Sequence, residues 1–548
     1  MDVNHLGSDY QTSRGPRVQL NQRFGREQPG YGRLLVRNML ASAVFAHAVQ
    51  NVSELGTERQ VIGPHYPSPH VHEQAGLRAA RVRSMKRTAV AFVLGVLLAV
   101  VPAASAQTGD PAYDHAVALG DQAYRYGFPL MEFLRVRDQE TSVPAPDRKG
   151  NAPVNVFSNA DKFARPSDRT VVAPNVDTLY SITHLDLGKG PIVIEHPNMG
   201  SRYFTFELVD PWTNVIGYVG SRTTGARAGK YAIAWSKKPG KRVPGVHTIT
   251  SQYRRVWVVG RTLTDGTPAD LRAARKLQEQ YALVPLDRLD NPPKPPATNT
   301  HVKPRKPVVP EGLAWFDALG DAMAANPPPA RDQPLLDQLA QVGIGPGLHP
   351  SQENLPQPVL DGLVAGFAQA KAALPNGAKS AVLQKAIAGG GWAPVPENLG
   401  AYGTDYETRA EIAVVGLGAN TIQEATYPTA LADSTGALLD GAKRYRIVFP
   451  RGQTPPNRAF WSLTMYTLDG FLVPNAEHRY AIGSTHPPLV KRRDGSVVVA
   501  VQHDRPAEKD VNWLPAPRAP FRMSLRIYWP EPSVLNGAWK PPPIEPVG

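Results

Sequence analysis

The feature that most constrains the fold of this chain is a complete secretory signal segment, which begins at an internal methionine and covers residues 85–106. Lys86 and Arg87 open it with positive charge, residues 89–101 form an uncharged apolar run, and Ala104-Ser105-Ala106 has the small-x-small pattern of a cleavage site. We therefore expect the chain to engage the export machinery and to be cleaved near Ala106-Gln107. The folded part is then a periplasmic or extracellular protein.

Residues 1–84, by contrast, show no sign of a fold of their own. They contain no tryptophan and no sustained helical or strand periodicity, and they are rich in Arg, Gln, Gly and His. We expect them to be an upstream extension that is either non-native or disordered. The alternative is a cytoplasmic tail before an uncleaved signal anchor, but the apolar run is shorter than the ~20 residues that a spanning helix needs.

The composition excludes several classes of site. The chain has no cysteine, so disulfides, thiol catalysis and cysteine-ligated metals are ruled out. Its formal net charge is +13, but the basic residues are interspersed with acidic ones and form no stripe with interleaved aromatic residues, as a nucleic-acid groove requires. We expect no nucleic-acid partner, and the sequence points to no particular cofactor.

Hydrophobic periodicity changes along the exported part. The apolar spacing in residues 111–135 predicts an amphipathic helix that Pro129 bends or ends. Residues 150–265 and 445–529 then contain short β-rich runs separated by Gly, Pro, Asn or Asp. Such spacing is typical of a sandwich or a barrel.

A proline-rich stretch separates the two strand-rich regions. Seven prolines in residues 291–310 predict an extended, semi-rigid linker. Residues 311–385 beyond it predict two or three short helices. We therefore expect a mainly β chain with a helical insert, of the α+β class. Its expected parts are an N-terminal helix plus β-sandwich at 111–290, the linker at 291–310, the helical insert at 311–420 and a C-terminal β-sandwich at 421–548.

Several multi-residue motifs are similar to those of two bacterial families. In the first strand-rich region they are Val172-Ala173-Pro174-Asn175-Val176-Asp177-Thr178-Leu179-Tyr180-Ser181, Arg202-Tyr203, Asp210-Pro211-Trp212-Thr213-Asn214 and Gly220-Ser221-Arg222-Thr223-Thr224-Gly225. In the second they are Ala459-Phe460-Trp461-Ser462-Leu463-Thr464-Met465-Tyr466, Asp469-Gly470-Phe471, Arg479-Tyr480, Gln502-His503-Asp504, Asn512-Trp513-Leu514-Pro515 and Tyr528-Trp529-Pro530. The first set resembles the family catalogued as domain of unknown function 1254, and the second resembles its companion, domain of unknown function 1214.

This resemblance covers roughly residues 113–548, because the linking segment Gly400-Ala401-Tyr402-Gly403-Thr404-Asp405-Tyr406 with Arg409 is also similar to the bridge between the two families. It implies an exported protein with two β-sandwich, jelly-roll-like domains joined by a helical insert. It supplies no agreed reaction, and a fold alone does not supply one.

Acidic residues are the best acid–base candidates, because the common catalytic motifs are absent. The chain has no Gly-x-Ser-x-Gly, no His-Glu-x-x-His and no phosphate-binding glycine loop. Two carboxyl groups at a suitable separation can cleave a glycosidic bond. The catalytic candidates are Asp177, Asp405, His503 and Asp504. The aspartates have an alternative role in turns or buried hydrogen bonds, and His503 is either an acid–base residue or a metal ligand. No metal site is predicted.

Ten residues in the matching motifs are candidates for ligand binding, because they offer amide, carboxylate, guanidinium and aromatic groups. They are Asn175, Tyr180, Asp210, Trp212, Arg222, Tyr406, Arg409, Trp461, Arg479 and Trp513. The tryptophans either stack on sugar rings or apolar ligands, or anchor the core of a sandwich. The arginines either bind an anionic ligand or hold carboxylates such as Asp210 and Asp405 in structural ion pairs.

Two functions are compatible with these residues, and whether the chain is an enzyme stays open. The first is binding, with or without hydrolysis, of a carbohydrate-like or small anionic ligand in a polar and aromatic cleft between two β-sandwich domains. The second is a non-catalytic, envelope-associated or surface-active role as a homo-oligomer. Convergence of Asn175, Asp177, Arg222, Asp405 and Arg409 in one pocket would favour the first, and a large exposed apolar patch would favour the second.

Overall fold

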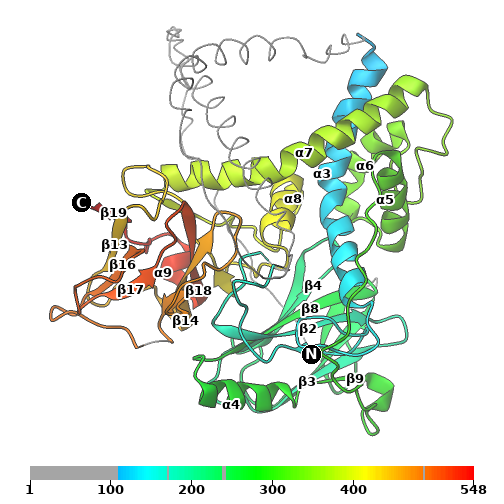
Figure 1. Cartoon of the computed structure of the whole chain (residues 1–548). Helices are drawn as coiled ribbons and strands as arrows, with labels where there is room; N and C mark the ends of the chain where they lie inside the picture. The colour runs from blue at the N-terminus through cyan, green and yellow to red at the C-terminus, as the bar shows by residue number, and fades with distance from the viewer. Residues whose placement is uncertain (1–108, 170–171, 237–241, 486–487) are drawn as a thin grey trace, which may run out of the picture. The chain divides into compact units, whose positions relative to one another are not determined.

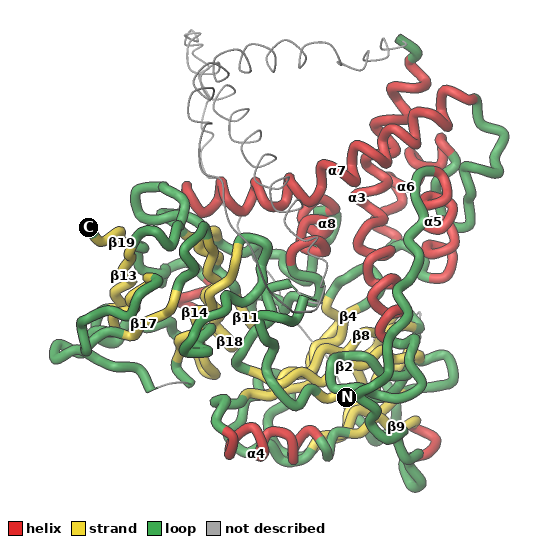
Figure 2. The backbone as a smooth tube through the Cα atoms, in the orientation of Figure 1, coloured by secondary structure: helices red, strands yellow, loops and turns green. Residues whose placement is uncertain are grey.

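The strands of this protein are short and are joined by long loops (Figure 2). The computed structural model describes residues 109–169, 172–236, 242–485 and 488–548, so the expectations for the upstream extension and the signal segment lie outside the described residues. The described residues belong to one compact unit. Within these ranges, no helix combines the length and the apolar character that a bilayer crossing needs.

The N-terminal β half contains two sheets, with strand orders β1-β2-β8-β4-β5 and β7-β6-β3-β9. Leu185 and Phe206 of the first sheet share one core cluster with Ile194 and Ile233 of the second, so the apolar faces of the two sheets pack together. The strands are β1 (Ser158–Asn159), β2 (Thr178–Asp186), β3 (Ile192–His196), β4 (Phe204–Val209), β5 (Val215–Gly220), β6 (Gly229–Trp235), β7 (His247–Ser251), β8 (Arg255–Leu263) and β9 (Ala282–Pro285).

The C-terminal β half also contains two sheets. One has the order β10-β12-β18-β14-β15, with β11 also paired to β18, and the other has the order β17-β16-β13-β19. The strands are β10 (Trp392–Ala393), β11 (Ala425–Thr426), β12 (Thr429–Ala430), β13 (Arg444–Phe449), β14 (Asn457–Thr467), β15 (Ala481–Gly483), β16 (Val497–Gln502), β17 (Asn512–Pro515), β18 (Phe521–Pro530) and β19 (Glu545–Val547). The predicted mainly β, α+β class is confirmed.

The two faces of β14 contact different parts of the protein. Trp461, Leu463 and Met465 enter the core of the C-terminal half. Successive side chains of a strand point to opposite faces, so Ser462 and Thr464 lie on the other side, where Ser462 bonds to a residue of the N-terminal half. The same alternation in β18 puts polar side chains on the face that meets the N-terminal half.

Helices form a separate layer around a third apolar core, to which α3, α5, α6, α7 and α8 contribute. The helices are α3 (Pro111–Glu140), α4 (Pro268–Gln278), α5 (Leu313–Ala325), α6 (Gln333–Leu339), α7 (Gln357–Ala388), α8 (Tyr406–Val415) and α9 (Pro532–Leu535), with 3-10 turns η1 (Leu286–Arg288), η2 (Ala330–Asp332) and η3 (Ala340–Val342). Asp110 caps the start of α3 by accepting from the Ala112 amide, and Pro111 occupies its first turn. The helix does not end at Pro129 but continues to Glu140.

The prediction of only short helices after residue 311 is wrong for α7, which is 32 residues long and contains Pro375. This helix crosses α3 (Figure 1). At the crossing Gly120, Gly362 and Gly366 let the two backbones approach, because a Cβ at Gly120 would lie 3.1 Å from the Leu363 carbonyl oxygen. Packing against α3 therefore outweighs the helix-breaking tendency of the proline.

Candidate functional site at the junction of the two β halves

Two oppositely charged side chains lie within otherwise apolar strands of the N-terminal half. Glu207 of β4 and Arg261 of β8 are 0% and 6% exposed. The strands pair antiparallel with Thr205 opposite Arg261, so Glu207 is the diagonal neighbour on the same face. Arg261 Nη1 donates to Glu207 Oε2 over 2.8 Å and to Asn420 Oδ1 over 3.3 Å. The pair therefore faces the segment that leads into the C-terminal half.

The Glu207 carboxyl group is poised for proton exchange near neutral pH. Burial raises the pKa of Glu207 to about 7, against the opposing effect of the Arg261 charge. Its Oε1 atom is buried and has no hydrogen-bond partner among the described residues. A carboxyl group that titrates near neutrality next to a fixed cation is a physical signature of an acid–base residue.

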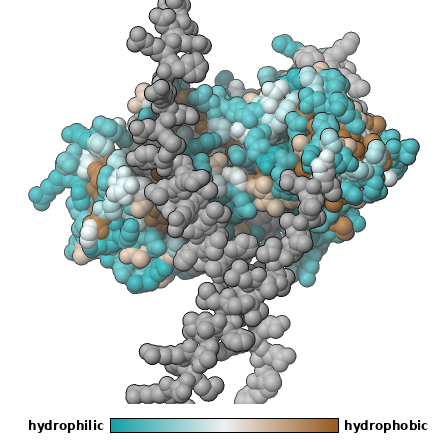
Figure 3. Space-filling model, turned by 90° about the horizontal axis from the view of Figure 1, so that it is seen from above, coloured by the Kyte–Doolittle hydropathy of each residue, from teal (hydrophilic) through white to brown (hydrophobic). Residues whose placement is uncertain are grey.

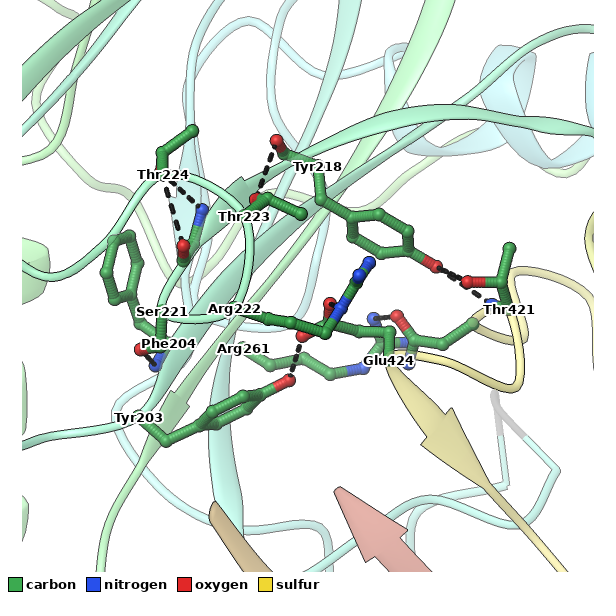
Figure 4. A network of polar contacts seen from close by, with 12 residues as sticks. Tyr203, Phe204, Tyr218, Ser221, Arg222, Thr223, Thr224, Arg261, Thr421 and Glu424 are labelled. Atoms are coloured by element: carbon green, nitrogen blue, oxygen red, sulfur yellow. Dashed lines mark hydrogen bonds and ion pairs between the residues drawn. The ribbon is translucent and has the colours of Figure 1, made fainter. Parts of the chain in front are cut away.

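Glu424, just before β11, carries a second buried carboxylate at the same junction. Tyr203 donates to its Oε1 over 2.6 Å, and Arg222 Nε lies 2.6 Å from its Oε2 (Figure 4). Glu424 is 1% exposed, but the Arg222 side chain is 24% exposed. Arg222 also lies over the Tyr218 ring, with its Cζ 5.3 Å from the ring centroid. This ion pair therefore links a loop of the N-terminal half to the C-terminal half and reaches solvent through Arg222.

Asn175 and Asp177 extend the junction from the start of β2. Asn175 Oδ1 accepts from the backbone amides of Asp177 and Thr178, which makes Asn175 the turn-forming residue. Its Nδ2 donates to the hydroxyls of Tyr180 at 2.9 Å and Tyr528 at 3.3 Å. The Asp177 carboxylate instead accepts from Ser462 Oγ of β14 over 2.6 Å. It therefore contributes a bond across the junction in addition to its place in the turn.

Arg526 of β18 completes this set. Its Nη1 donates to Thr464 Oγ1 over 2.9 Å, and its Nη2 donates to the carbonyl oxygen of Ala173 over 2.7 Å. Tyr466 donates to the Pro174 carbonyl oxygen over 2.6 Å. Three arginines, three carboxylic acids, three asparagine or serine side chains and five tyrosines thus meet between the halves. This junction network consists of Asn175, Asp177, Tyr180, Tyr203, Glu207, Arg222, Arg261, Asn420, Glu424, Tyr427, Ser462, Tyr466, Arg526 and Tyr528.

The junction network is closed at its centre and open at its edges. Tyr528 is 1% exposed and stacks on Phe460, whereas Tyr180, Arg222 and Tyr427 are each partly exposed. Burial raises the pKa of Tyr427 to about 12, so its hydroxyl is protonated at neutral pH. A ligand at these edges would therefore meet a guanidinium group and neutral hydroxyls backed by a buried, charge-paired interior.

A second group of predicted residues converges on Arg409 of α8, away from the junction network. The Arg409 Cζ lies 5.1 to 5.2 Å from the ring centroids of Trp212, Tyr126 and Tyr406. Both of these tyrosines donate to Asp332, from Tyr126 over 3.0 Å and from Tyr406 over 2.9 Å. Arg409 is only 1% exposed. We call Arg409 with Tyr126, Trp212 and Tyr406 the Arg409 cage. It joins helices α3 and α8 to the N-terminal half as a structural cation–π site.

Asp210 belongs to the neighbourhood of the Arg409 cage. Burial raises the pKa of Asp210 to about 6, and its hydrogen bonds from Asn214 act in the opposite direction. The Asn214 amide donates to Asp210 Oδ1 over 2.9 Å. Trp212 in turn donates from Nε1 to the Asn326 carbonyl oxygen over 3.2 Å. A structural ion pair is one of two roles open to the arginines; Arg409 forms none with Asp210, although its charge favours the ionised Asp210 carboxylate.

The remaining catalytic candidates lie elsewhere. Asp405 is exposed and caps α8 by accepting from the Thr408 amide over 3.1 Å. His503 donates from Nδ1 to the Ala516 carbonyl oxygen over 3.0 Å, and its Nε2 lies 3.9 Å from Asp504 Oδ1. The structure thus places Asp405 at a helix start and the His503–Asp504 pair on the surface of the C-terminal half.

The other ligand-binding candidates also lie outside the junction network. Trp461 is 2% exposed and belongs to the core of the C-terminal half. Arg479 donates from Nη1 to the Trp513 carbonyl oxygen over 3.0 Å, and Trp513 donates from Nε1 to the Gln502 carbonyl oxygen over 2.9 Å. Of the five residues whose convergence would indicate one pocket, Asn175, Asp177 and Arg222 meet at the junction, whereas Asp405 and Arg409 lie on α8.

Several important residues escape sequence reasoning. Glu207 and Arg261 lie outside the residues singled out from the matching motifs. Glu207 is the one charged residue of β4, and Arg261 follows a run of apolar residues in β8, so this contrast is a usable signal. Glu424, Asp332 and Arg526 have no such local signal, because their partners are distant in sequence. In the described ranges, no three His, Asp or Glu side chains are grouped so that they could hold a metal ion.

Comparison with known proteins confirms the resemblance to both families. Residues 154–285 match the family described as protein of unknown function DUF1254, and residues 424–532 match the family described as protein of unknown function DUF1214. No curated protein gives a significant match. The N-terminal match contains Glu207, Arg222 and Arg261, and the C-terminal match begins at Glu424, so both matched segments contribute residues to the junction network.

Two solved structures are similar to this chain. The VPA0106 protein of Vibrio parahaemolyticus is 22% identical with a TM-score of 0.56, and the match covers 79% of this chain and 100% of that chain. It supports the fold alone. A putative uncharacterized protein from Burkholderia cenocepacia is 14% identical with a TM-score of 0.35, over 80% of this chain and 94% of that chain.

Proposed function

We propose that this chain, which joins a DUF1254 segment to a DUF1214 segment, binds a carbohydrate-like or small anionic ligand at the junction network. The observation that carries the proposal is the Arg222–Glu424 ion pair, because it lies between the two halves and leaves the guanidinium group 24% exposed. Arginine presents donors in a planar fork that matches carboxylates, and the neighbouring tyrosine hydroxyls suit a hydroxyl-rich ligand.

Glu207 gives this site an acid–base group. Hydrolysis of a glycosidic bond needs a carboxylic acid that is protonated at working pH and a second carboxylate that is ionised. Glu207, with its pKa of about 7, suits the first role. Glu424 is held by Arg222 and Tyr203 and suits the second. Hydrolysis is therefore the reaction that these two groups support best, with Glu207 as the acid, a residue that is not among the predicted catalytic candidates.

The test is a binding screen of the purified protein against neutral sugars, sugar acids and small carboxylates, read by thermal shift and titration calorimetry. A compound that binds the parent should bind Arg222→Gln at least ~10-fold more weakly, because a charge-assisted hydrogen bond is lost. Arg227→Gln removes the same charge from an exposed residue outside the network and should leave the affinity unchanged.

A second variant keeps this test decisive if Arg222→Gln does not fold. Tyr180→Phe removes one partly exposed hydroxyl and retains the ring, so the fold should survive. It should weaken the binding of the same compound by a few-fold. The absence of any ligand for the parent, or equal affinity of both variants and the parent, would contradict the proposal.

An oligomeric, surface-active role is the alternative prediction. On the face seen in Figure 3, where grey atoms do not cover it, hydrophobic residues occur in patches among hydrophilic ones. Exposed large hydrophobic residues of the described part include Trp235, Val308 and Leu468. We rank ligand binding first, because the Arg222–Glu424 ion pair offers a specific polar contact for a ligand. Size-exclusion chromatography with light scattering tests the alternative, which predicts a stable multimer.

Two further properties belong to the same proposal. We propose that the folded part acts after export, since the signal segment precedes it directly in the sequence. We also propose that each β half is a jelly-roll-like sandwich. The shared core between its two sheets supports this assignment. The parallel pairs β6–β7 and β16–β17 are additions that a fully antiparallel jelly roll lacks.

A further inference from the structure

A cavity separate from the junction network lies where the turn before β8 faces the end of α5. It has a volume of about 520 Å³, which is in the range of small-molecule sites. Its lining includes Trp235 at the end of β6, the turn residues Tyr253, Arg254 and Arg255, and the stretch Asn326–Ala330. Residues from the N-terminal half and from the helical layer therefore line the cavity together.

The described lining of the cavity is positively charged. Of the described residues that line it, two are arginines and none is acidic. Arg254 is paired with Asp186, with its Nη2 2.8 Å from Oδ2. Arg255 is half-buried, and its side chain forms no ion pair or hydrogen bond with a described residue. A partly buried guanidinium group without a partner is unfavourable.

The charged groups near Arg255 form ion pairs with other residues and not with Arg255. Burial lowers the pKa of Arg255 and the nearby charge of Arg137 acts in the same direction, whereas the carboxylates of Asp138 and Asp186 act against this shift. The carboxylates that could balance it are already used, because Asp138 lies 2.7 Å from Arg137 and Asp186 is held by Arg254. An anion in the cavity would therefore supply the partner that the protein does not.

The walls beside Arg255 favour a flat apolar body. Trp235 is 43% exposed, and its indole Nε1 already donates to the Gln252 carbonyl oxygen over 3.2 Å, so its ring offers mainly a stacking surface. Pro327, Pro328 and Pro329 also line the cavity, with rigid rings. Aromatic rings pack well between such surfaces.

We propose that this cavity is a second binding site, which takes an aromatic carboxylate with its carboxylate on Arg255 and its ring between Trp235 and the three prolines. The probe is 2-naphthoate, and titration calorimetry and tryptophan fluorescence measure its binding. Its neutral amide, 2-naphthamide, should bind roughly 10-fold or more weakly, because it cannot form a charge-assisted hydrogen bond with Arg255. The saturated analogue decalin-2-carboxylate should also bind more weakly.

Substitutions of residues that line the cavity test whether 2-naphthoate binds there. Arg255→Gln should weaken the binding of 2-naphthoate by roughly 10-fold or more and leave the fold intact, because no ion pair or hydrogen bond among the described residues depends on the Arg255 side chain. Trp235→Leu should weaken it by several-fold and reduce the fluorescence response. Arg272→Gln makes the same charge change on α4, at an exposed residue that does not line the cavity, and should leave binding unchanged.

Three results would overturn the inference: no saturable binding of 2-naphthoate, equal affinity for its neutral amide, or equal affinity in Arg255→Gln. Loss of binding in Arg222→Gln with retention in Arg255→Gln would place the probe at the junction network instead. That result would contradict this inference and support the proposed function, so failures of the two proposals are distinguishable.

Discussion

At the scale of single residues, Glu207 shows how burial and charge compete within one strand. Removal from water disfavours the ionised carboxylate, and the bond from Arg261 favours it. The outcome is a pKa of about 7, above the ordinary value of 4.5. Because the folded protein then binds more protons than the unfolded chain between these two values, Glu207 contributes stability at low pH that is lost as the pH rises through about 7.

Glu207→Gln should remove this pH dependence. Glutamine resembles the protonated acid, so the variant and the parent should have similar free energies of unfolding at pH about 5. At pH about 8 the variant should be more stable than the parent, by on the order of 2 kcal/mol. Urea unfolding at several pH values measures the difference between the two proteins, in which the parallel contribution of Asp210 cancels.

Glu353→Gln at an exposed site serves as the control for loss of a carboxylate. It should differ little from the parent at either pH. If instead the parent becomes increasingly more stable than Glu207→Gln as the pH rises, Arg261 holds the carboxylate ionised in the folded state. Glu207 would then be a structural anion and not the acid that the proposed function requires.

At the scale of elements, the crossing of α3 and α7 depends on glycines that have different roles within one helix. A Cβ at Gly366 would collide with the carbonyl oxygen of Val117 and lie 2.8 Å from the amide nitrogen of Asp121, whereas nothing lies within 4 Å of a Cβ at Gly377. The first glycine allows close packing. The second only costs conformational entropy.

Alanine at these two positions should therefore act in opposite directions. Gly366→Ala should lower the free energy of unfolding by about 1–3 kcal/mol, because the backbones must separate. Gly377→Ala should raise it by about 0.5–1 kcal/mol through helix propensity. Urea unfolding followed by circular dichroism tests both. Equal effects of the two substitutions would show that the glycines at the crossing are not needed for packing.

The elements also show what sequence reasoning could and could not predict. Period-two alternation correctly separates the faces of β14, because successive side chains of a pleated strand point to opposite sides. Leu463 therefore packs in the core of the C-terminal half, and Ser462 contacts the N-terminal half. The length of α7 could not be predicted, because Pro375 is a typical signal for the end of a helix. The packing that stabilises α7 despite this proline comes from α3, more than 200 residues earlier in the sequence. The site was found only in part for the same reason. Asn175 and Arg222 lie in recognisable motifs, but their partners Tyr528 and Glu424 are distant in sequence.

At the scale of the whole molecule, the junction network makes the two β halves depend on each other. Tyr466 and Arg526 of the C-terminal half donate to carbonyl oxygens just before β2, and Ser462 donates to Asp177. Separation of the halves would leave these buried groups without partners. We therefore expect the described part to unfold in one cooperative transition.

Ser462→Ala tests this dependence. It should lower the free energy of unfolding by about 1–3 kcal/mol, because the buried carboxylate of Asp177 loses a donor. Scanning calorimetry should still show one transition, and hydrogen exchange should rise in both β4 and β14. Ser434→Ala, which removes an exposed bond to Glu545, should change little. Two separate transitions, or faster exchange in only one half, would show that the halves fold independently.

The most direct test of a ligand site built jointly by the two halves is a crystal structure of the protein soaked with the strongest compound from the binding screen. We predict that the compound lies between the halves, with its acidic or hydroxyl groups on Arg222 and the hydroxyls of Tyr180 and Tyr427. A compound bound within one half alone, with the Arg222–Glu424 ion pair and its surroundings unchanged, would contradict the account.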